Sequence, residues 1–290
     1  MPSDPKPEVH ALLHAGTSTI CYIVACPETK QCAVVDAVLD FDLSSGSTGT
    51  TFADQVIAKV RELGLSVQWV LETHVHADHL SGAPVIRAAL GGTVGIGDHI
   101  NEVQAGFAEI YNLGPDFPTD GRQFDHLFAD GEQFAIGKIQ ARAMHTPGHT
   151  PACLTYHIAD AVFCGDTIFM PDFGTARCDF PGGSARTLYR SIQRILALPP
   201  ETRVFVGHDY GPGGRDIAWE TTVADQRRSN KHVKDGIDEN AFVEMRTERD
   251  AELAMPGLLL PSIQVNIRAG ELPEPEDNGV SYMKLPLNQF

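Results

Sequence analysis

The chain has 290 residues, of which 42% are apolar and 21% are charged, and its formal net charge is -16 at pH 7. These fractions are typical of a globular protein, and no stretch approaches the roughly 18 unbroken apolar residues of a membrane-spanning helix. The negative charge argues against a nucleic-acid partner, because proteins bind nucleic acids mainly through Lys and Arg side chains that neutralise phosphates. An anionic substrate would therefore have to be held by a few local cations.

The start of the chain, MPSDPKPEVH, has neither the basic nor the apolar segment of a secretory signal. We therefore expect a cytoplasmic protein with no membrane association. The cysteines are irregularly spaced and contain no CxxC pair, which favours buried reduced thiols over disulfides. They are Cys21, Cys26, Cys32, Cys153, Cys164 and Cys178.

Runs of apolar and β-branched residues predict strands in the first third of the chain, and apolar residues at helical spacing predict helices between them. The predicted strands are residues 9–13, 20–25, 32–37, 67–71 and 93–96. The predicted helices are residues 52–63, 82–90 and 100–111. The Ser- and Gly-rich stretch 44–49 is predicted to be a loop that ends in a helix cap.

The second half begins with a further group of strands and then becomes mixed. The predicted strands are residues 133–135, 139–144, 152–158, 162–164 and 204–206, and the predicted helices are 185–196, 219–228 and 240–253. A Pro-rich tail, 256–290, contains a strand-like piece at 263–267. Two strand-rich halves, each with its own helices, predict two sheets packed face to face with helices outside. We expect one domain, 1–290, with a C-terminal extension at about 231–290.

The strongest local signal is a cluster of metal-ligand residue types directly after a predicted strand. His74, His76, Asp78 and His79 occur within six positions. Neutral imidazole binds transition metals and Asp supplies an anionic oxygen, so a turn at a strand end can direct several of them at one point. The sequence therefore predicts a metal site here, rather than a His-rich surface turn.

Three later segments place a ligand-type residue beside a glycine at or just beyond a predicted strand. They are His145 to Thr150 (HTPGHT), Cys164 to Thr167 (CGDT) and Val206 to Tyr210 (VGHDY). Glycine permits a tight turn or a close approach of the backbone, which would hold the ligand on a rigid strand end. The three segments add His149, Asp166 and His208 to the candidate ligands.

The order HxHxDH, TPGHT, GDT and GHD resembles that of the metallo-β-lactamase superfamily over roughly residues 9–249. The resemblance implies an α/β (α+β) fold, a four-layer αββα sandwich with its metal site at the edge where both sheets end. Within the superfamily the chain is similar to the glutathione-linked branch, which contains glyoxalase II and the persulfide dioxygenases.

The two enzymes of this branch use the same residue types differently. By resemblance to glyoxalase II, one metal is held by His74, His76 and His149, a second by Asp78, His79 and His208, and Asp166 lies between them. By resemblance to persulfide dioxygenases, a single Fe(II) is held by His74, His149 and Asp166. Two His and one carboxylate leave open positions for substrate and O2. His76, Asp78, His79 and His208 would then orient ligands or hydrogen-bond bound water, with Asp78 and His79 as the catalytic candidates.

The segment after Asp166 favours the persulfide dioxygenases. Gly174, Arg177 and Asp179-Phe180, followed by Thr187-Leu188-Tyr189, are similar to their pattern, although Arg177 comes slightly later than expected. Glyoxalase II usually has Lys followed shortly by Tyr here. A guanidinium can bind a carboxylate of glutathione through two nitrogens. The alternative is an Arg177–Asp179 surface ion pair.

A second pair of cations, Arg246 and Arg249, is spaced to share one helical face. The stretch that contains them is similar to the C-terminal glutathione-anchoring segment of glyoxalase II. Alternatively, Glu244, Glu248 and Asp250 neutralise both arginines. Thr150, beside His149, completes the candidate substrate-binding residues.

The resemblance predicts a glutathione persulfide dioxygenase with one Fe(II) per chain, which oxidises GSSH with O2 to sulfite and glutathione. The alternative is a glyoxalase II-like hydrolase of glutathione thioesters with two Zn, Fe or Mn ions. A metal-free relative without activity is disfavoured by the intact set of ligand residues. The sequence contains no rhodanese-like second domain, so a separate sulfurtransferase is an expected partner, and a homodimer is compatible with the sequence.

Overall fold

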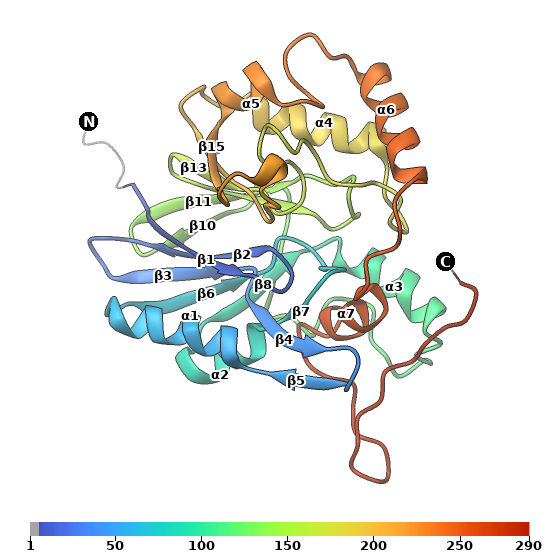
Figure 1. The fold of residues 1–290 in the computed structure, drawn as a ribbon. Coiled ribbons are helices and arrows are strands. Elements are labelled where there is room, and N and C mark those ends of the chain that lie inside the picture. Colours follow the sequence, from blue (N-terminus) through green and yellow to red (C-terminus); the bar gives the residue numbers. More distant parts are fainter. Residues whose placement is uncertain (1–5, 290) are drawn as a thin grey trace.

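A computed structural model describes residues 6–289 and contains two six-stranded sheets (Figure 1). The first sheet has the strand order β1-β2-β3-β6-β8-β9. Its strands are β1 (Glu8–His14), β2 (Thr19–Ala25), β3 (Gln31–Val35), β6 (Ser66–Leu71), β8 (Thr93–Gly97) and β9 (His126–Phe128). The meander β1-β2-β3 is antiparallel, and β3, β6, β8 and β9 are parallel.

The second sheet has the strand order β10-β11-β12-β13-β14-β15 and is antiparallel except for the parallel pair β13 and β14. Its strands are β10 (Gln133–Ile136), β11 (Ile139–His145), β12 (Leu154–Ile158), β13 (Ala161–Phe163), β14 (Arg203–Phe205) and β15 (Glu220–Thr222). A small third sheet joins β5 (Ser47–Gly49), β4 (Val38–Asp42) and β7 (Leu80–Ser81).

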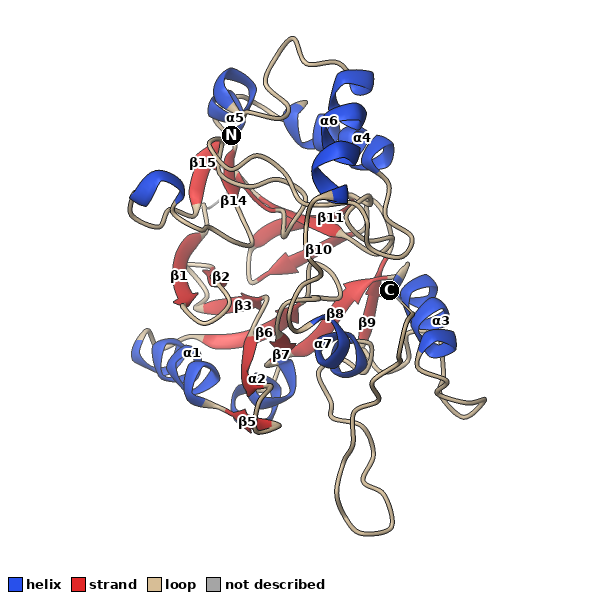
Figure 2. Ribbon diagram, turned by 45° about the vertical axis from the view of Figure 1, so that its right-hand side comes forward, coloured by secondary structure: helices blue, strands red, loops and turns tan. Residues whose placement is uncertain are grey.

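Helices cover the outer faces of both sheets, and the predicted αββα sandwich is confirmed (Figure 2). The first sheet is covered by α1 (Thr51–Glu62), α2 (Ala83–Leu90), α3 (Ile100–Ile110) and α7 (Leu259–Asn266). The second is covered by α4 (Ala185–Leu196), α5 (Val223–Ser229) and α6 (Glu239–Ala251), and a short 3-10 turn, η1 (Pro212–Gly214), lies in the loop before β15. No helix in the described part of the chain is long and apolar enough to cross a membrane.

Strand β2 illustrates why the two sheets pack in this way. All seven of its residues are buried, and alternate side chains belong to two different cores. Ile20, Tyr22 and Val24 pack between the sheets, whereas Cys21 and Ile23 pack under the helices. A strand that is covered on both faces is apolar along its whole length instead of alternating.

The six cysteines are all buried and unpaired, as predicted. Most of the predicted elements are also confirmed within a residue or two of their ends. The elements that differ from the prediction each have a physical cause.

The strand-like piece at 263–267 is wrong, since these residues belong to helix α7. Seven of the eight residues of α7 are buried, and its polar residues Ser262, Gln264 and Asn266 alternate with apolar ones, so the sequence shows the period of a strand. Its β-branched residues suggested a strand, but burial in the tertiary structure overrides that weak preference.

The helix predicted at 219–228 is wrong in its first part. Residues Glu220–Thr222 form strand β15, and helix α5 begins only after the Thr222 hydroxyl accepts a hydrogen bond from Asp225 N. The loop predicted at 44–49 likewise ends in the short strand β5. Strands β4, β7 and β9 were not predicted: β7 and β9 are too short to show a hydrophobic period, and β4 (VLDFD) contains two aspartates, which are rare in strands.

Candidate metal centre

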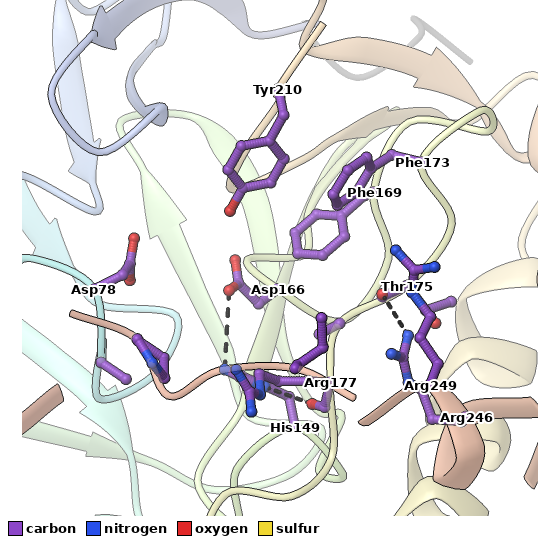
Figure 3. Close-up of a pocket in the computed structure, with 14 residues that line it drawn as sticks. Asp78, His149, Asp166, Phe169, Phe173, Thr175, Arg177, Tyr210, Arg246 and Arg249 are labelled. Atoms are coloured by element: carbon purple, nitrogen blue, oxygen red, sulfur yellow. Dashed lines mark hydrogen bonds and ion pairs between the residues drawn. The ribbon is translucent and has the colours of Figure 1, made fainter. Parts of the chain in front are cut away.

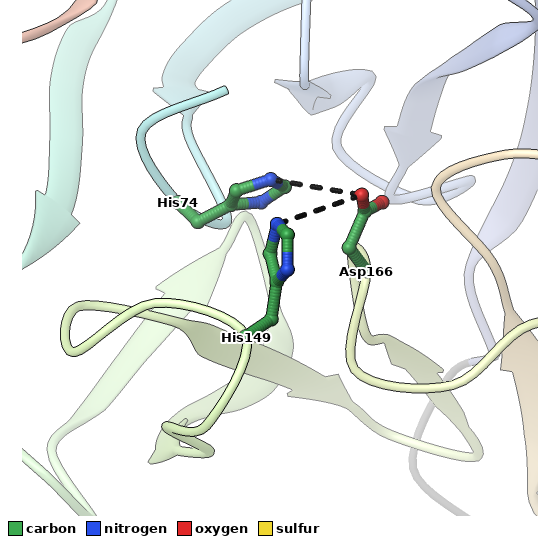
Figure 4. Close-up of side chains that lie close together, drawn as sticks. All are labelled: His74, His149 and Asp166. Atoms are coloured by element: carbon green, nitrogen blue, oxygen red, sulfur yellow. Dashed lines mark ion pairs between the residues drawn. The ribbon is translucent and has the colours of Figure 1, made fainter. Parts of the chain in front are cut away.

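The predicted ligands lie just beyond the ends of four strands. His74 follows β6, His149 follows β11, Asp166 follows β13 and His208 follows β14. Because these strand ends lie along one edge of the two facing sheets, residues far apart in the sequence converge on one point (Figure 4).

Three of these residues form the group that Figure 4 shows. His74 Nε2 lies 3.9 Å and His149 Nε2 lies 3.8 Å from Asp166 Oδ2. Two atoms that each lie about 2.1 Å from one ion can be at most about 4.2 Å apart, so both distances are compatible with a shared metal. The fold therefore brings two His and one carboxylate within reach of one ion.

A second group lies on the other side of Asp166. His208 Nε2 is 3.3 Å from Asp166 Oδ1 and 3.4 Å from Asp78 Oδ2. His76, Asp78 and His79 also offer ligand atoms within 4.8 Å of one another. Asp166 thus directs one carboxylate oxygen to each group, so the geometry is compatible with one metal or with two.

The hydrogen bonds of the histidines show which ring nitrogen faces the centre. His149 Nδ1 donates to Arg177 O at 2.8 Å, His79 Nδ1 donates to Leu80 O, and His208 Nδ1 donates to Ser18 O. In each of these three rings, Nε2 therefore faces the metal centre. Backbone contacts of this kind fix the tautomer and orientation of metal-binding histidines.

His76 is oriented the other way round. Its Nε2 lies 3.1 Å from both Asp36 Oδ1 and Glu72 Oε2, and its Nδ1 has no hydrogen-bond partner among the described residues. Asp36 also accepts hydrogen bonds from Thr73 N and Oγ1, and Glu72 accepts one from Ser81 Oγ at 2.5 Å. The sequence analysis missed both carboxylates, because they precede the cluster and carry no ligand motif of their own.

Several buried polar atoms at this point have no hydrogen-bond partner among the described residues. They are His74 Nε2, His76 Nδ1, Asp78 Oδ2, His79 Nε2 and Asp166 Oδ1. Buried polar atoms are nearly always paired, and their convergence here needs a partner that protein atoms do not supply. His and Asp donors suit a transition metal, so the residues fit the ion that the sequence predicts.

The protonation of His74 and His79 is also suited to metal binding, whereas Asp36 and Glu72 raise the pKa of His76, and Asp166 and Asp78 raise that of His208, in spite of burial. Burial, together with the neighbouring histidines, lowers the pKa of His74 well below its ordinary value. Burial and the charge of His76 lower the pKa of His79 to about 3. Both rings are therefore neutral at pH 7, which is the form that binds metal.

Two glycines permit this close packing. At Gly165, where φ is +48°, a Cβ would lie 2.3 Å from Thr73 Oγ1. At Gly207 a Cβ would lie 2.7 Å from Asp166 Oδ1. Any side chain at either position would displace a residue of the centre, which supports the interpretation of these glycines as close-approach positions.

Two further residues, which the sequence analysis missed, support the loops of the centre. Arg215 lies 2.5 and 2.7 Å from the buried Asp209 carboxylate and 2.6 and 2.8 Å from Asp172. It thereby joins the segment after His208 to the segment after Asp166. Asn266 of α7 donates to both His76 O and His79 O at 2.8 Å.

A cavity of about 240 Å³ opens onto the centre (Figure 3). Asp78, His149 and Asp166 line its inner end, and the aromatic rings of Phe169, Phe173 and Tyr210 form one wall. The Tyr210 hydroxyl points toward Asp166 in Figure 3. Arg177, Arg246 and Arg249 also line the cavity, so three of the predicted substrate-binding residues are brought together.

The three arginines differ in what they already bind. Arg177 binds both oxygens of Asp179, at 2.6 and 2.5 Å, and donates to Ala254 O, so the predicted alternative of a local ion pair is formed. Arg246 is 1% exposed and lies 2.6 Å from Asp250 Oδ1. Within residues 6–289, Arg249 has no carboxylate within 4 Å.

Thr150 lies apart from these residues. It is fully buried, and its hydroxyl lies 3.1 Å from Cys153 Sγ rather than in the cavity lining. The structure thus gathers seven candidate ligands at the centre and three arginines at the cavity, and it places Thr150 in the packing beneath them.

Comparison with known proteins places these features in a family. A model of the metallo-beta-lactamase superfamily matches residues 16–208. A probable metallo-hydrolase of Burkholderia pseudomallei is 54% identical over 290 residues, which cover 97% of this chain and 99% of that protein. Glyoxylase B2 of Dictyostelium discoideum is 53% identical, and the match covers 99% of both chains.

More distant matches carry more specific names. The crystal structure of ETHE1 from Myxococcus xanthus superposes with a TM-score of 0.71 at 26% identity and covers 91% of this chain and 100% of that one. The human mitochondrial persulfide dioxygenase ETHE1 is 26% identical over 87% of this chain and 84% of its own. A hydroxyacylglutathione hydrolase of Rhodospirillum rubrum is 34% identical over 65% of this chain and 61% of its own.

Proposed function

Because this chain belongs to the metallo-beta-lactamase superfamily, we propose that it is a metalloenzyme of the glutathione-linked branch and that it acts as a glutathione persulfide dioxygenase. The proposed reaction is GSSH + O2 + H2O giving GSH + sulfite + 2 H⁺. The observation that carries the proposal is the group formed by His74, His149 and Asp166 at the inner end of the cavity.

In this proposal His74, His149 and Asp166 hold one Fe(II). Bound iron supplies the redox chemistry that allows O2 to react with a persulfide sulfur. A metal held by these three residues would keep coordination positions open for other molecules. His76, held by Asp36 and Glu72, keeps the first group in place from behind.

The cavity supplies orientation and excludes water. Phe169, Phe173 and Tyr210 form an aromatic wall against which the apolar part of the tripeptide would pack. Arg249, which has no carboxylate partner among the described residues, provides the local positive charge that an anionic substrate needs in a protein of net charge -16. A substrate held between the two would present its terminal sulfur to the inner end.

A second candidate is a dinuclear hydrolase of glutathione thioesters. It is favoured by the contact of His208 Nε2 with both Asp78 and Asp166, and by the names of the relatives at 53% and 54% identity. Two Zn, Fe or Mn ions would then be held by all seven residues, with Asp166 between them.

The decisive experiment compares the two reactions on one preparation. Protein purified and reconstituted with Fe(II) without oxygen should consume O2 when GSSH is added, and it should contain about one iron per chain. S-lactoylglutathione serves as the hydrolase substrate in parallel. Absence of O2 uptake with GSSH, together with thioester hydrolysis and two metals per chain, would replace the dioxygenase by the hydrolase.

Arg249 is the arginine best placed to bind the tripeptide, because it lines the cavity and has no carboxylate partner among the described residues. Replacement of Arg249 by Met is expected to raise KM for GSSH about 10- to 100-fold with little change in kcat, since a hydrogen bond to a charged group contributes about 1.5–3 kcal/mol. Steady-state O2 uptake measures both constants.

Two further variants make this test specific. Arg122→Met is the matched control, because Arg122 is exposed and pairs only with Asp120 outside the cavity. In Asp179→Asn the guanidinium of Arg177 loses its carboxylate partner and becomes available to the substrate. KM for GSSH should then fall if Arg177 also binds a carboxylate of the tripeptide. An unchanged KM in Arg249→Met would remove Arg249 from the binding site.

A further inference from the structure

A second cavity, of about 400 Å³, lies on the other side of the metal centre. It is bounded by the turn between β1 and β2 and by the β4–β5 hairpin, and His79 lines it together with His14, Thr17 and Asp40. His79 belongs to the metal centre and is 1% exposed. It lines this second cavity but not the first one, so the two cavities reach different residues of the centre.

His14 is held inside this cavity by two polar partners. Its Nε2 donates to Asp40 Oδ1 at 3.3 Å, and its Nδ1 lies 2.8 Å from Thr17 Oγ1. The other oxygen of Asp40 accepts from Phe52 N, which fixes the carboxylate at the start of α1. An imidazole with a hydrogen-bond partner on each nitrogen can receive a proton on one side and release one on the other.

The hydrogen-bonded chain continues inward from His14. Thr17 Oγ1 lies 2.7 Å from Thr19 Oγ1, and Thr19 is 1% exposed. The backbone of Thr19 pairs with that of His208, and the adjacent Ser18 O accepts from His208 Nδ1. The side-chain hydrogen bonds therefore start at Asp40 in the cavity and end at Thr19, whose backbone, and not its hydroxyl, pairs with His208 of the centre.

We propose that this cavity is a second, water-filled opening of the active site and that His14, with Asp40, conducts protons between the centre and solvent. The volume is large enough for several water molecules, and its polar lining offers them hydrogen-bond partners. The opening is separate from the arginine-lined cavity, so protons can leave while that cavity is filled by substrate.

The proposal rests on the proposed function, which releases two protons per turnover when GSSH, O2 and water give GSH and sulfite. The thioester hydrolysis considered above also releases one proton per turnover, as the thioester and water give a carboxylate, a thiol and H⁺. The Thr17 hydroxyl gives its proton to His14 Nδ1 and takes one from water in the cavity, while the proton on His14 Nε2 passes to Asp40 or to solvent. His14 is therefore a positioning and proton-conducting residue that does not touch the substrate.

The test is the variant His14→Gln, because glutamine keeps hydrogen-bonding capacity at the β1–β2 turn but cannot carry a proton at neutral pH. We expect kcat to fall about 10- to 100-fold, at the lower end of what proton transfer contributes, with KM unchanged. The solvent deuterium isotope effect on kcat should rise, and added imidazole should restore part of the rate in His14→Ala. His10→Gln, on the same strand, is the control and should behave as wild type.

The outcomes separate this inference from the proposed function. Wild-type kcat, an unchanged isotope effect and no rescue by imidazole in a folded His14→Gln protein would overturn the inference while leaving O2 uptake intact. Thioester hydrolysis in place of O2 uptake would overturn the proposed function, yet the same effects of His14→Gln on hydrolysis would support the inference. A wild-type protein with neither activity would overturn both.

Discussion

Asp166→Asn is expected to abolish both metal retention and turnover. Asp166 Oδ2 faces His74 and His149, whereas Oδ1 faces His208, so the substitution removes an anionic ligand from every arrangement that the centre allows. Loss of a residue that only hydrogen-bonds a metal ligand typically lowers metal affinity about 10- to 100-fold. Loss of Asp166, which faces both groups, should lower it more. Metal content after gel filtration and O2 uptake with GSSH measure the two effects.

The matched control is Asp160→Asn, because Asp160 lies just before β13 and, within residues 6–289, forms ion pairs with Lys6 and Arg203 alone. Its metal content and activity should equal those of the wild type. A companion variant, His208→Ala, distinguishes one metal from two: a mononuclear centre keeps its single iron, and a dinuclear centre loses one of its two ions. Retention of full metal and activity in Asp166→Asn would contradict the assignment of the centre.

Arg246→Met is expected to destabilise the protein by about 3–5 kcal/mol. Arg246 is 1% exposed, its guanidinium lies 2.6 Å from Asp250 Oδ1, and the substitution leaves a buried carboxylate without a cation. Urea unfolding followed by circular dichroism measures the change. Arg190→Met is the control: Arg190 is largely exposed and pairs with Glu239, so its loss should leave the stability almost unchanged.

The Arg246–Asp250 ion pair also supports the metal centre indirectly. Arg246 donates to Thr175 O, and Asp250 Oδ2 accepts from Cys178 N, so both ends of residues 175–178 are held by α6. Arg177 O, in the middle of this segment, accepts from His149 Nδ1. Arg246→Met should therefore lower metal content as well as stability, and a destabilisation below 1 kcal/mol with full metal content would refute this role.

The buried ion pair of Arg246 gives this residue a different role from the one predicted from the sequence. Arg246 and Arg249 were predicted to act together on an anion, with neutralisation by nearby acidic residues as the alternative. The structure forms the neutralising pair for Arg246 with Asp250, four residues later on the same helix face. Arg249 keeps its charge available to the cavity, so the two neighbouring arginines have different tasks.

The metal ligands could be predicted from the sequence because the chemistry is encoded locally. Few residue types bind transition metals, and in this chain they recur beside glycines just after apolar strands. The strands themselves show in the sequence because β2, β3 and β6 consist mostly of apolar residues. Strands that end on one edge of a sheet bring such residues together, whatever the conformation of the loops between them.

The supports of the ligands could not be predicted in the same way. Asp36, Glu72 and Asn266 contact His76 or its backbone, yet Asn266 is separated from His76 by 190 positions. Nothing in the local sequence distinguishes a buried carboxylate or amide from an exposed one. The same holds for α7, whose apolar sequence is equally compatible with a strand until its burial is known.

The sequence by itself therefore determined the sandwich, the set of candidate metal ligands and the presence of local cations in an acidic protein. Only the tertiary structure decided which nitrogen of each histidine faces the centre, that Asp166 serves both groups, and that Arg177 and Arg246 already hold carboxylates whereas Arg249 does not. The reason is physical: residue type fixes what a side chain can bind, but its hydrogen-bond partners and its burial depend on segments distant in the chain.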